Sequence, residues 1–285
     1  MKKILLQLDS DPQASVFDVV TAYDAGADQV LQYAGVTPET ARDLVYGLIF
    51  TRGVDELKNS AVFVGGSSVA IGEKVLKVVK KSFLGPLQVS VMLDSNGCNT
   101  TAAAAVAKIL SQGELAGKKV AVLAGTGPVG LRAAAMLAQE GAQVVLTSRK
   151  LDRAAEACAS IQERFGVQVT PAAASDEDST RAVLEGAYAV LCTGGAGVML
   201  VPESIWVEHP TLKVLADVNA VPPLGIEGIK PNWNEKEKNG KIIFGALGIG
   251  GLKMKVHRGS VARLFEQNDL VVDAEEAFAV AKALI

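Results

Sequence analysis

The sequence predicts an α/β fold with mainly parallel strands, and three observations support this prediction. Short strand-like apolar runs alternate with longer helical runs almost throughout the chain. One strand-like run passes through a glycine-rich loop directly into a helical run near the middle of the chain. The length of 285 residues is enough for one large domain or two ordinary ones with a real buried core. Such alternation is typical of βαβ units, which assemble parallel sheets.

The first hundred residues carry four strand-like runs with helical patterns between them. The apolar runs predict strands at residues 3–8, 29–33, 61–66 and 88–93, and helices at residues 15–25, 38–49 and 68–83. A further helix is predicted in the segment TTAAAAVAKILSQG, with Asn99 or Thr100 as its N-cap and Gly113 beyond its end. We therefore expect a first α/β series that ends in an alanine-rich helix.

A second series begins at Lys118 and has the order of a doubly wound sheet. Strands are predicted at 118–124, 142–148, 167–172, 187–193 and 212–218, and helices at 128–140, 152–165 and near 176–186. The following segment 235–241, EKEKNGK, is interpreted as a solvated loop, and 242–246 as a strand. A glycine-rich turn and a C-terminal helical region complete the chain. The strand–helix rhythm predicts a domain at 104–249, and the last helices could return to the first domain.

Composition and charge exclude several classes of function. Hydrophobic residues make up 49% and charged residues 21% of the chain, which is typical of globular proteins. The net charge of −3 gives no basic footprint for nucleic acid or an anionic membrane. No apolar run reaches transmembrane length, and the N-terminal segment turns acidic too early for a secretion signal. Three scattered cysteines and two histidines predict a reducing cytoplasm, no disulfide framework and no metal site.

The glycine loop at 125–130 predicts a dinucleotide site. Gly125, Gly127 and Gly130 form a GxGxxG motif that follows a predicted strand and opens a predicted helix. The first glycine permits the tight turn, the second lets the backbone approach a pyrophosphate, and the third allows close packing of helix on strand. Pro128 suits the first helical turn, and the helix dipole favours an anion there. Thr126 and Val129 belong to the same loop and are also predicted to contact the dinucleotide. The alternative is that the loop is a glycine-rich turn that binds no ligand.

The residues at the end of the next predicted strand favour NADP over NAD. An NAD site usually carries an acidic residue there, whereas this chain has Thr147, Ser148, Arg149 and Lys150. A carboxylate would repel a 2′-phosphate, whereas a hydroxyl and a guanidinium can bind it. Alternatively, Arg149 and Lys150 lie at a solvent-facing helix start. Two further cofactor contacts are predicted after later strands, Thr193 and Asn219, although Asn219 could instead satisfy its own turn.

Polar residues outside the glycine loop are candidates for a substrate site. The loop 93–103 collects Asp94, Ser95, Asn96, Asn99, Thr100 and Thr101 between a strand and a helix. Ligands of open α/β sheets bind beyond the carboxyl ends of strands, so this loop is well placed, although turn and capping chemistry explains the same residues. Asp18, beside Phe17, lies on an otherwise apolar helical segment, where an acid is usually solvated.

The segment 245–258, GALGIGGLKMKVHR, is a further candidate. Its glycines let the backbone approach a flat ring or another chain, and Lys253 could emerge there. Close helix packing with snorkelling lysines explains the segment equally well. The chain shows no Ser-His-Asp set, Cys–His nucleophile or P-loop. That absence suits hydride transfer, in which a cofactor does the chemistry and the protein supplies position and electrostatics.

Together, the segments FDVVTAYDAGAD, AVFVGG, MLDSNGCNTTAAAAVA, KKVAVLAGTGPVGLRAA, VVLTSRKLD, NAVPPLGI and GALGIGGLKMKVHR make the chain resemble a known family. The sequence resembles the NADP-dependent methylene-tetrahydromethanopterin dehydrogenases of C1-metabolising bacteria over essentially its whole length. The resemblance implies a central Rossmann domain at 104–249 and a substrate domain built from both chain ends, 1–103 and 250–285. It also implies oxidation of a methylene-pterin by NADP in one-carbon metabolism, and a homotrimer.

The resemblance assigns roles to individual residues. Lys253 matches the family's lysine at the reaction site, and Arg149 matches the basic position at the 2′-phosphate. Asp18, Asn96, Thr100 and Thr101 fall in substrate-facing motifs. We therefore expect Lys253, Asp18 and Thr100 to be catalytic, and Phe17, Asn96 and Thr101 to bind the substrate.

Three alternatives stay open at this level. Related enzymes use tetrahydrofolate in place of tetrahydromethanopterin, and some members accept NAD. Another two-domain NADP oxidoreductase, such as a shikimate-dehydrogenase-like enzyme, shares the glycine loop. A dinucleotide-binding sensor without turnover would bind NADP and reduce none of it.

Overall fold

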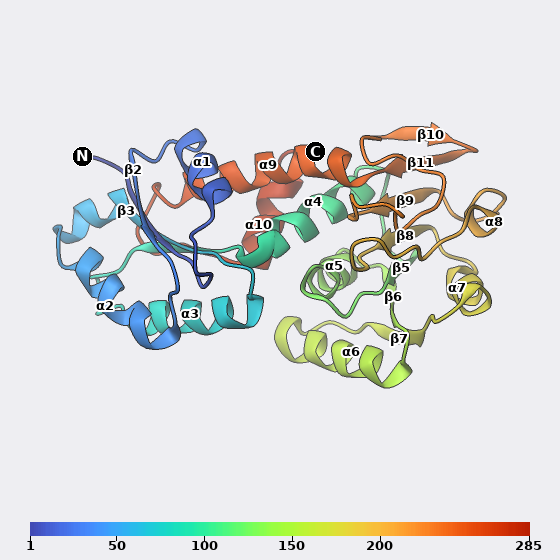
Figure 1. Ribbon diagram of the computed structural model, residues 1–285, viewed down its shortest axis with the longest axis horizontal. Coiled ribbons are helices and arrows are strands. Elements are labelled where there is room, and N and C mark those ends of the chain that lie inside the picture. The colour runs from blue at the N-terminus through green and yellow to red at the C-terminus, as the bar shows by residue number, and fades with distance from the viewer. The chain divides into compact units, whose positions relative to one another are not determined.

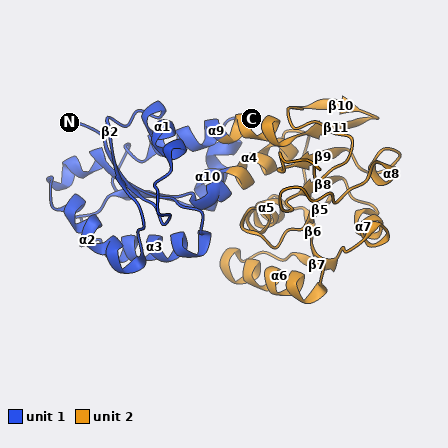
Figure 2. Cartoon of the chain, viewed as in Figure 1, with its two compact units in different colours: residues 1–100, 254–284 blue, residues 101–253, 285 orange.

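The computed structural model describes residues 1–285 and contains two mainly parallel sheets, each covered by helices (Figure 1). Unit 1 comprises residues 1–100 and 254–284, and unit 2 comprises residues 101–253 with residue 285 (Figure 2). The boundaries fall inside two helices, α4 (Cys98–Leu110) and α9 (Ala246–Arg263). None of the helices is both long enough and apolar enough to cross a membrane. The α/β class predicted from the sequence is confirmed.

Unit 1 contains a five-stranded, fully parallel sheet in the order β12-β4-β3-β1-β2. Its strands are β1 (Ile4–Leu8), β2 (Gln29–Tyr33), β3 (Ser60–Val64), β4 (Ser90–Leu93) and β12 (Val271–Val272). Its helices are α1 (Val16–Asp24), α2 (Pro38–Ile49), α3 (Val69–Lys81) and α10 (Ala274–Lys282), with short 3-10 turns η1 (Val54–Asn59) and η2 (Ser95–Gly97). The four predicted strands are confirmed, and β12 is an addition from the chain's other end.

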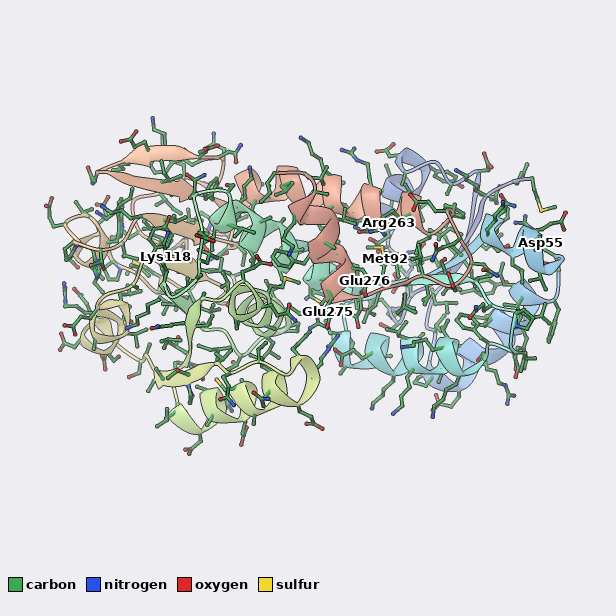
Figure 3. All side chains as sticks on the ribbon, turned by 180° about the vertical axis from the view of Figure 1, so that it is seen from behind. Asp55, Met92, Lys118, Arg263, Glu275 and Glu276 are labelled. Carbon is green, nitrogen blue, oxygen red and sulfur yellow. The ribbon has the colours of Figure 1, made fainter.

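The sheet of unit 1 is buried on both faces, as parallel sheets usually are. One face carries Leu6 and Val62 and packs against α2 and α3. The other face carries Leu5, Phe63 and Met92 (Met92 is labelled in Figure 3) and belongs to a core cluster with residues of α1 and α9. The polar side chains described below lie next to this second face, at the carboxyl ends of β3 and β4.

Unit 2 contains a seven-stranded sheet in the order β10-β11-β9-β8-β5-β6-β7. Its strands are β5 (Lys119–Leu123), β6 (Gln143–Ser148), β7 (Thr170–Ala173), β8 (Ala189–Cys192), β9 (Val214–Asp217), β10 (Lys236–Lys238) and β11 (Lys241–Phe244). Its helices include α5 (Pro128–Gln139), α6 (Leu151–Phe165), α7 (Glu177–Leu184) and α8 (Glu203–Trp206). Without the edge strand β10, this is the 3-2-1-4-5-6 order of a doubly wound sheet, so the predicted Rossmann topology is confirmed.

The interpretation of residues 235–241 as a solvated loop is wrong. Residues 236–238 form β10, which pairs antiparallel with β11. The connecting residues Asn239 and Gly240 both have positive φ, 52° and 67°. A two-residue hairpin turn of type I′ needs positive φ at both central residues, and Asn-Gly is the dipeptide that adopts it most readily. The dipeptide Asn239-Gly240 could therefore have predicted the hairpin from the sequence.

The predicted glycine-rich turn after β11 is also wrong, because residues 246–263 form the single helix α9. A Cβ added to Gly245 would lie 2.6 Å from the carbonyl oxygen of Pro231, and one added to Gly248 would overlap the carbonyl oxygen of Trp233. These two glycines therefore let the start of α9 pack directly against neighbouring backbone. That packing outweighs the cost of about 1 kcal/mol that glycine imposes inside a helix.

Candidate functional site

A pocket of about 860 Å³ lies at the carboxyl ends of the central strands of unit 2. The strands β6 and β8 flank β5, so the chain reverses its direction of winding here, and ligands of doubly wound sheets bind at such a point. The lining residues come from the segments after β5, β6 and β8: Leu123, Ala124, Thr126, Gly127, Thr147, Ser148, Arg149, Lys150, Arg153, Ala174, Thr180, Thr193, Gly194, Gly195, Val198 and Leu200.

The glycine loop between β5 and α5 has the geometry that its three glycines predict. The amide of Gly125 donates to the carbonyl of Thr147, and a Cβ on Gly125 would lie 2.8 Å from Cγ of Leu146. A Cβ on Gly130 would lie 2.5 Å from Cα of Gly125. No atom lies within 4 Å of the Cβ position of Gly127. Gly125 and Gly130 are thus required by packing, whereas Gly127 leaves the backbone open to a ligand.

The start of α5 is suited to an anion. Gly127 is the N-cap and Pro128 the first helical residue, where its missing N–H costs nothing. The amides of Val129 and Gly130 have no acceptor within the helix, because the first turn of any helix leaves such donors. Together with the positive end of the helix dipole, they favour a negatively charged group next to Gly127.

Three cations and no carboxylate line the pocket. Ser148 ends β6, and Arg149 and Lys150 follow it as exposed residues. Arg153, in the first turn of α6, is the third cation and was not predicted from the sequence. Its spacing of three residues from Lys150 at a helix start was the signal that could have found it. The arrangement gives the pocket a positive rim.

Thr193 and Asn219 differ in their relation to this pocket. Thr193 lines it, and its hydroxyl donates to the carbonyl of Leu123 at 3.1 Å. Asn219 is buried and does not line it; its amide nitrogen donates to the carbonyl of Pro223 at 3.2 Å, and its oxygen accepts the amide of Val221. The side chain of Asn219 thus satisfies its own loop, and a contact with the cofactor stays a prediction for this residue.

The carboxylate of Asp217, at the end of β9, is buried next to Cys192. Burial raises the pKa of Asp217, although the amides of Asn219 and Ile226 donate to the carboxylate and oppose the shift. Burial, followed by the charge of Asp217, raises the pKa of Cys192 well above its usual value. Such complete burial is typical of cysteines that serve packing in a core.

A second polar cluster lies in unit 1, at the carboxyl end of β4. Oδ1 of the buried Asp94 accepts the amides of Asn99 and Thr100, both at 3.0 Å, and Oδ2 accepts the Thr100 hydroxyl at 2.6 Å. Helix α4 starts at Cys98, so the prediction of Asn99 or Thr100 as N-cap is wrong. The carboxylate of Asp94 supplies the capping acceptor from outside the helix, which spacing within the helix could not reveal.

His257, on α9, is the residue that sequence reasoning missed in this cluster. Its Nδ1 lies 3.4 Å from Oδ2 of Asp94, and its Nε2 lies 4.0 Å from Oδ1 of Asp18. The imidazole stacks on Phe63 and meets the ring of Phe17 edge-on. In the sequence, His257 belongs to the candidate segment 245–258 and gives no signal of a metal site. Its place one helical turn after Lys253, on the same helix face, was the available signal.

The residues predicted to contact the substrate occupy different environments. Phe17, at the start of α1, is 48% exposed, Asp18 is half-buried, and Asn96 is exposed with a positive φ of 53°. Thr100 is fully buried and its hydroxyl donates to Asp94, so it lies on the interior side of the cluster. Thr101 and Lys253 are half-buried and belong to unit 2. Direct contacts of these residues with a substrate stay predictions.

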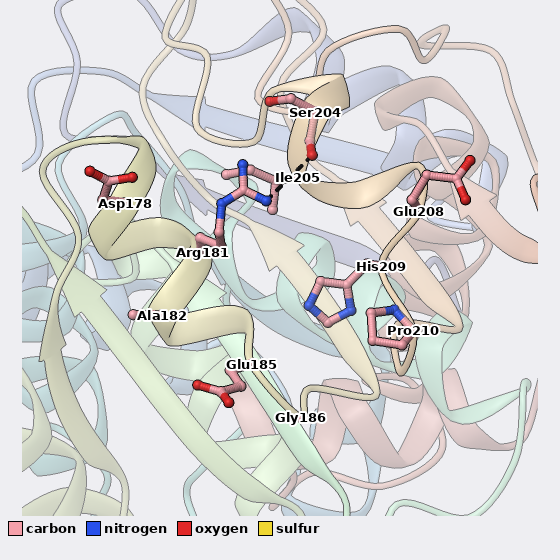
Figure 4. A pocket seen from close by; sticks show the side chains of 10 residues that line it. All are labelled: Asp178, Arg181, Ala182, Glu185, Gly186, Ser204, Ile205, Glu208, His209 and Pro210. Carbon is pink, nitrogen blue, oxygen red and sulfur yellow. Dashed lines mark hydrogen bonds between the residues drawn. The ribbon is translucent and has the colours of Figure 1, made fainter.

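A smaller hollow of about 480 Å³ lies between α7 and α8 (Figure 4). Arg181 there pairs with Glu177 and donates to the carbonyl of Ser204. Burial, followed by the charge of Lys241, lowers the pKa of His209, whose Nδ1 accepts the amide of Leu212. The lining segments 185–186 and 208–210 precede β8 and β9, so the hollow adjoins the amino ends of these strands. Ligands of doubly wound sheets bind at the opposite ends.

The doubly wound sheet and the pocket at its switch point define a Rossmann-type dinucleotide-binding fold. A solved structure of shikimate 5-dehydrogenase from Listeria monocytogenes, in complex with shikimate and NAD, has a similar fold. The similarity has a TM-score of 0.52 and 13% sequence identity, and covers 100% of this chain and 96% of that chain. At this level of identity, the likeness concerns the fold alone.

The sequence comparisons identify the family. Residues 16–96 match the model of the N-terminal region of methylene-tetrahydromethanopterin dehydrogenase. A protein of Methylorubrum extorquens strain AM1, called bifunctional protein MdtA, is 51% identical over 285 residues, covering 99% of each chain. A second protein of that strain, called NAD(P)-dependent methylenetetrahydromethanopterin dehydrogenase, is 31% identical over 290 residues, covering 98% of each chain. The chain belongs to the methylene-tetrahydromethanopterin dehydrogenase family, which confirms the resemblance noted in its sequence.

Proposed function

We propose that this protein oxidises methylene-tetrahydromethanopterin to its methenyl form by hydride transfer to NADP, in one-carbon (formaldehyde) metabolism. The observation that carries the proposal is the whole-chain identity of 51% to a member of this family. The pocket in unit 2 supports the dinucleotide part of the proposal, because its open glycine and helix start suit a pyrophosphate.

The preference for NADP over NAD is supported by the charges at the pocket. Arg149, Lys150 and Arg153 line it together with the hydroxyl of Ser148, and no carboxylate is present to accept the ribose hydroxyls of NAD. A 2′-phosphate would gain charge-assisted hydrogen bonds from these groups. A guanidinium can also pair with two phosphate oxygens at once, which a lysine cannot do.

The chemistry of the substrate requires little acid–base catalysis. The bridging carbon lies between two nitrogens whose lone pairs stabilise the product cation. NADP held in the pocket of unit 2 would supply the hydride acceptor. The protein therefore acts mainly by fixing the reacting partners in a near-attack geometry. In this proposal Lys253 organises the pterin without a covalent role. The carboxylate of Asp18 provides a negative charge for the cation that develops.

We also propose a homotrimer in the cytoplasm. Helix α1 exposes Val16, Val20 and Tyr23 along one face, and the edge strand β2 exposes Leu31 and Tyr33. Contiguous apolar side chains next to an unpaired strand edge are typical of surfaces that another chain covers. The three cysteines are all unpaired, as in a reducing compartment. Light scattering coupled to size-exclusion chromatography tests the trimer, and a monomer would contradict it.

The decisive experiment follows NADPH absorbance with methylene-tetrahydromethanopterin and methylene-tetrahydrofolate, each with NADP and with NAD. We expect the highest kcat/KM for the first pterin with NADP. Higher activity with the folate would make the protein a methylene-tetrahydrofolate dehydrogenase. Binding of NADP without reduction by either substrate would indicate a sensor and contradict the proposal.

A further inference from the structure

We infer that His257 is a positioning residue, which ties Asp18 to Asp94 and thereby orients Phe17 and Asp18 at the start of α1 for the pterin. The inference rests on the proposed function, because Asp18 is taken there as a group that faces the substrate. All four residues belong to unit 1.

The burial of His257 is the first observation. The side chain of His257 is 1% exposed and that of Asp94 0%, whereas the side chain of Asp18 is 15% exposed. A polar ring in such a place costs free energy unless polar groups meet its nitrogens. Each nitrogen has a carboxylate near it: Asp94 lies 3.4 Å from Nδ1, and Asp18 lies 4.0 Å from Nε2, which is beyond hydrogen-bond distance but close enough for an electrostatic contact. Asp94, His257 and Asp18 thus form a row that extends from the interior to the partly exposed side chain of Asp18.

The orientation of the imidazole is fixed by aromatic contacts. Phe63 of β3 stacks on it, with ring centroids 5.5 Å apart and an interplanar angle of 24°. Phe17 meets it edge-on, at 5.9 Å and 71°. A ring held in this way keeps Nδ1 on the side of Asp94 and Nε2 on the side of Asp18. Phe17 is therefore held by the same imidazole whose Nε2 faces the neighbouring Asp18.

Asp94 is a rigid anchor for this arrangement. Both of its oxygens accept hydrogen bonds from the start of α4. The side-chain amide of Asn99 donates to the carbonyl of Leu93 at 2.6 Å and to Asp273, the N-cap of α10, at 3.0 Å. The position of Asp94 is thus set by β4, α4 and α10 together, and His257 extends that rigidity to α1.

The other oxygen of Asp18 lies next to a glycine. A Cβ on Gly65 would lie 3.3 Å from Oδ2 of Asp18 and 3.1 Å from Phe63. The carboxylate of Asp18 therefore lies between the backbone at Gly65 and the imidazole of His257. The backbone amide of Asp18 donates to the hydroxyl of Ser15. The glycine offers no side chain to restrain Asp18 on that side, whereas His257 contacts Asp18 from within the core.

The first test is spectroscopic and does not depend on turnover. The chain has only two histidines, so the imidazole ¹⁵N–¹H spectrum of the intact protein contains two rings, and His209→Gln assigns them. We expect Asp18→Asn to shift the His257 ring signals. The matched control is Asp24→Asn on the same helix, whose carboxylate lies 3.8 Å from Arg258. Equal shifts in the two variants would overturn the inference.

The second test is a double-mutant cycle on kcat/KM for methylene-tetrahydromethanopterin. We expect His257→Phe and Asp18→Asn each to lower it about tenfold or more, with the KM for NADP changed less than about twofold. The double variant should be no worse than Asp18→Asn within about threefold, because both changes break one unit. Additive losses, or an effect of His257→Phe below about twofold, would overturn the inference.

A third variant separates positioning from folding. His257→Gln keeps a polar group in reach of Asp18 and should recover activity to within about fivefold of the wild type, whereas His257→Phe keeps only the apolar packing. If both variants lose activity equally while their unfolding midpoints match the wild type, the positioning role is wrong. His209→Gln serves as the unaffected control. An inactive wild type would contradict the proposed function, and the spectroscopic test would still decide the inference.

Discussion

The two units are built alike but form their candidate sites in different ways. Each is a mainly parallel sheet with helices on its faces, and polar groups lie at the carboxyl ends of the strands in both. In unit 2 the site consists of backbone and exposed cations from short contiguous segments, such as 124–127 and 147–153. In unit 1 it consists of buried side chains that are far apart in sequence: Asp18, Asp94 and His257.

This difference decides how each site responds to substitution. A site made of backbone fails when a side chain is added, because added atoms occupy the space of the ligand or of packed neighbours. A site made of buried side chains fails when one of them is removed, because its partners then remain buried without compensation. The two kinds of site are therefore sensitive to opposite changes.

Gly130→Ala should strongly destabilise unit 2, whereas Gly127→Ala should not. The first methyl would overlap the backbone of Gly125 and cost about 3 kcal/mol of unfolding free energy. The second would enter open space, leaving stability within about 0.5 kcal/mol, but should weaken NADP binding about tenfold or more. Thermal unfolding and NADP titration measure both. Normal NADP affinity in Gly127→Ala would show that the ligand does not approach this backbone.

Lys253→Ala should lower kcat/KM for the methylene-pterin about tenfold to a hundredfold, because a positive group that organises the substrate is lost. The Kd for NADP should stay within about twofold, since Lys253 does not line the pocket of unit 2. Lys255→Ala, an exposed lysine two residues along the same helix, is the matched control. A loss within about twofold for Lys253→Ala would refute its role.

The double variant Arg149→Ala, Arg153→Ala should raise the KM for NADP about tenfold or more, since charge-assisted hydrogen bonds to a phosphate contribute about 1.5–3 kcal/mol. The KM for NAD should hardly change, because NAD lacks the 2′-phosphate. Arg181→Ala, outside the pocket, controls for the loss of positive charge. Equal effects on NADP and NAD would contradict the assignment of this rim to the 2′-phosphate.

Asp217 allows the same comparison within unit 2, because it is a buried side chain whose carboxylate accepts hydrogen bonds from backbone amides. Burial raises its pKa in the folded chain above the usual 3.8, so the folded state holds its proton more tightly than the unfolded state. The stability that this adds is present at low pH and is lost as the pH rises from about 3.8 through the raised pKa. Asp217→Asn should lack this dependence.

We therefore expect the unfolding midpoint of Asp217→Asn, relative to the wild type, to increase with pH over that window by a few degrees at most. Scanning calorimetry at a series of pH values from about 4 to 7 measures it. Parallel pH profiles of the variant and the wild type would show that the carboxylate is not protonated more readily in the folded chain.

Most of the fold was predictable from the sequence, and the errors of that prediction have identifiable causes. The four strands of the first hundred residues and the doubly wound order of the second series match apolar periodicity, which is a local property. The hairpin at 236–244 was missed although Asn239-Gly240 is a hairpin signal. The glycines of α9 predicted a turn because their compensating contact, with backbone at 230–234, is not local.

The sequence by itself determined the glycine loop and its charged surroundings, because the tight turn, the close packing of Gly130 on Gly125 and the run Ser148-Arg149-Lys150 are all encoded within thirty residues or so. Only the tertiary structure decided that His257 lies between Asp18 and Asp94, and that Asp94 caps α4. Residues so distant along the chain meet only when the sheet of unit 1 brings α1, β4 and α9 together. Periodicity records which face of an element is buried, but not which polar group meets another there.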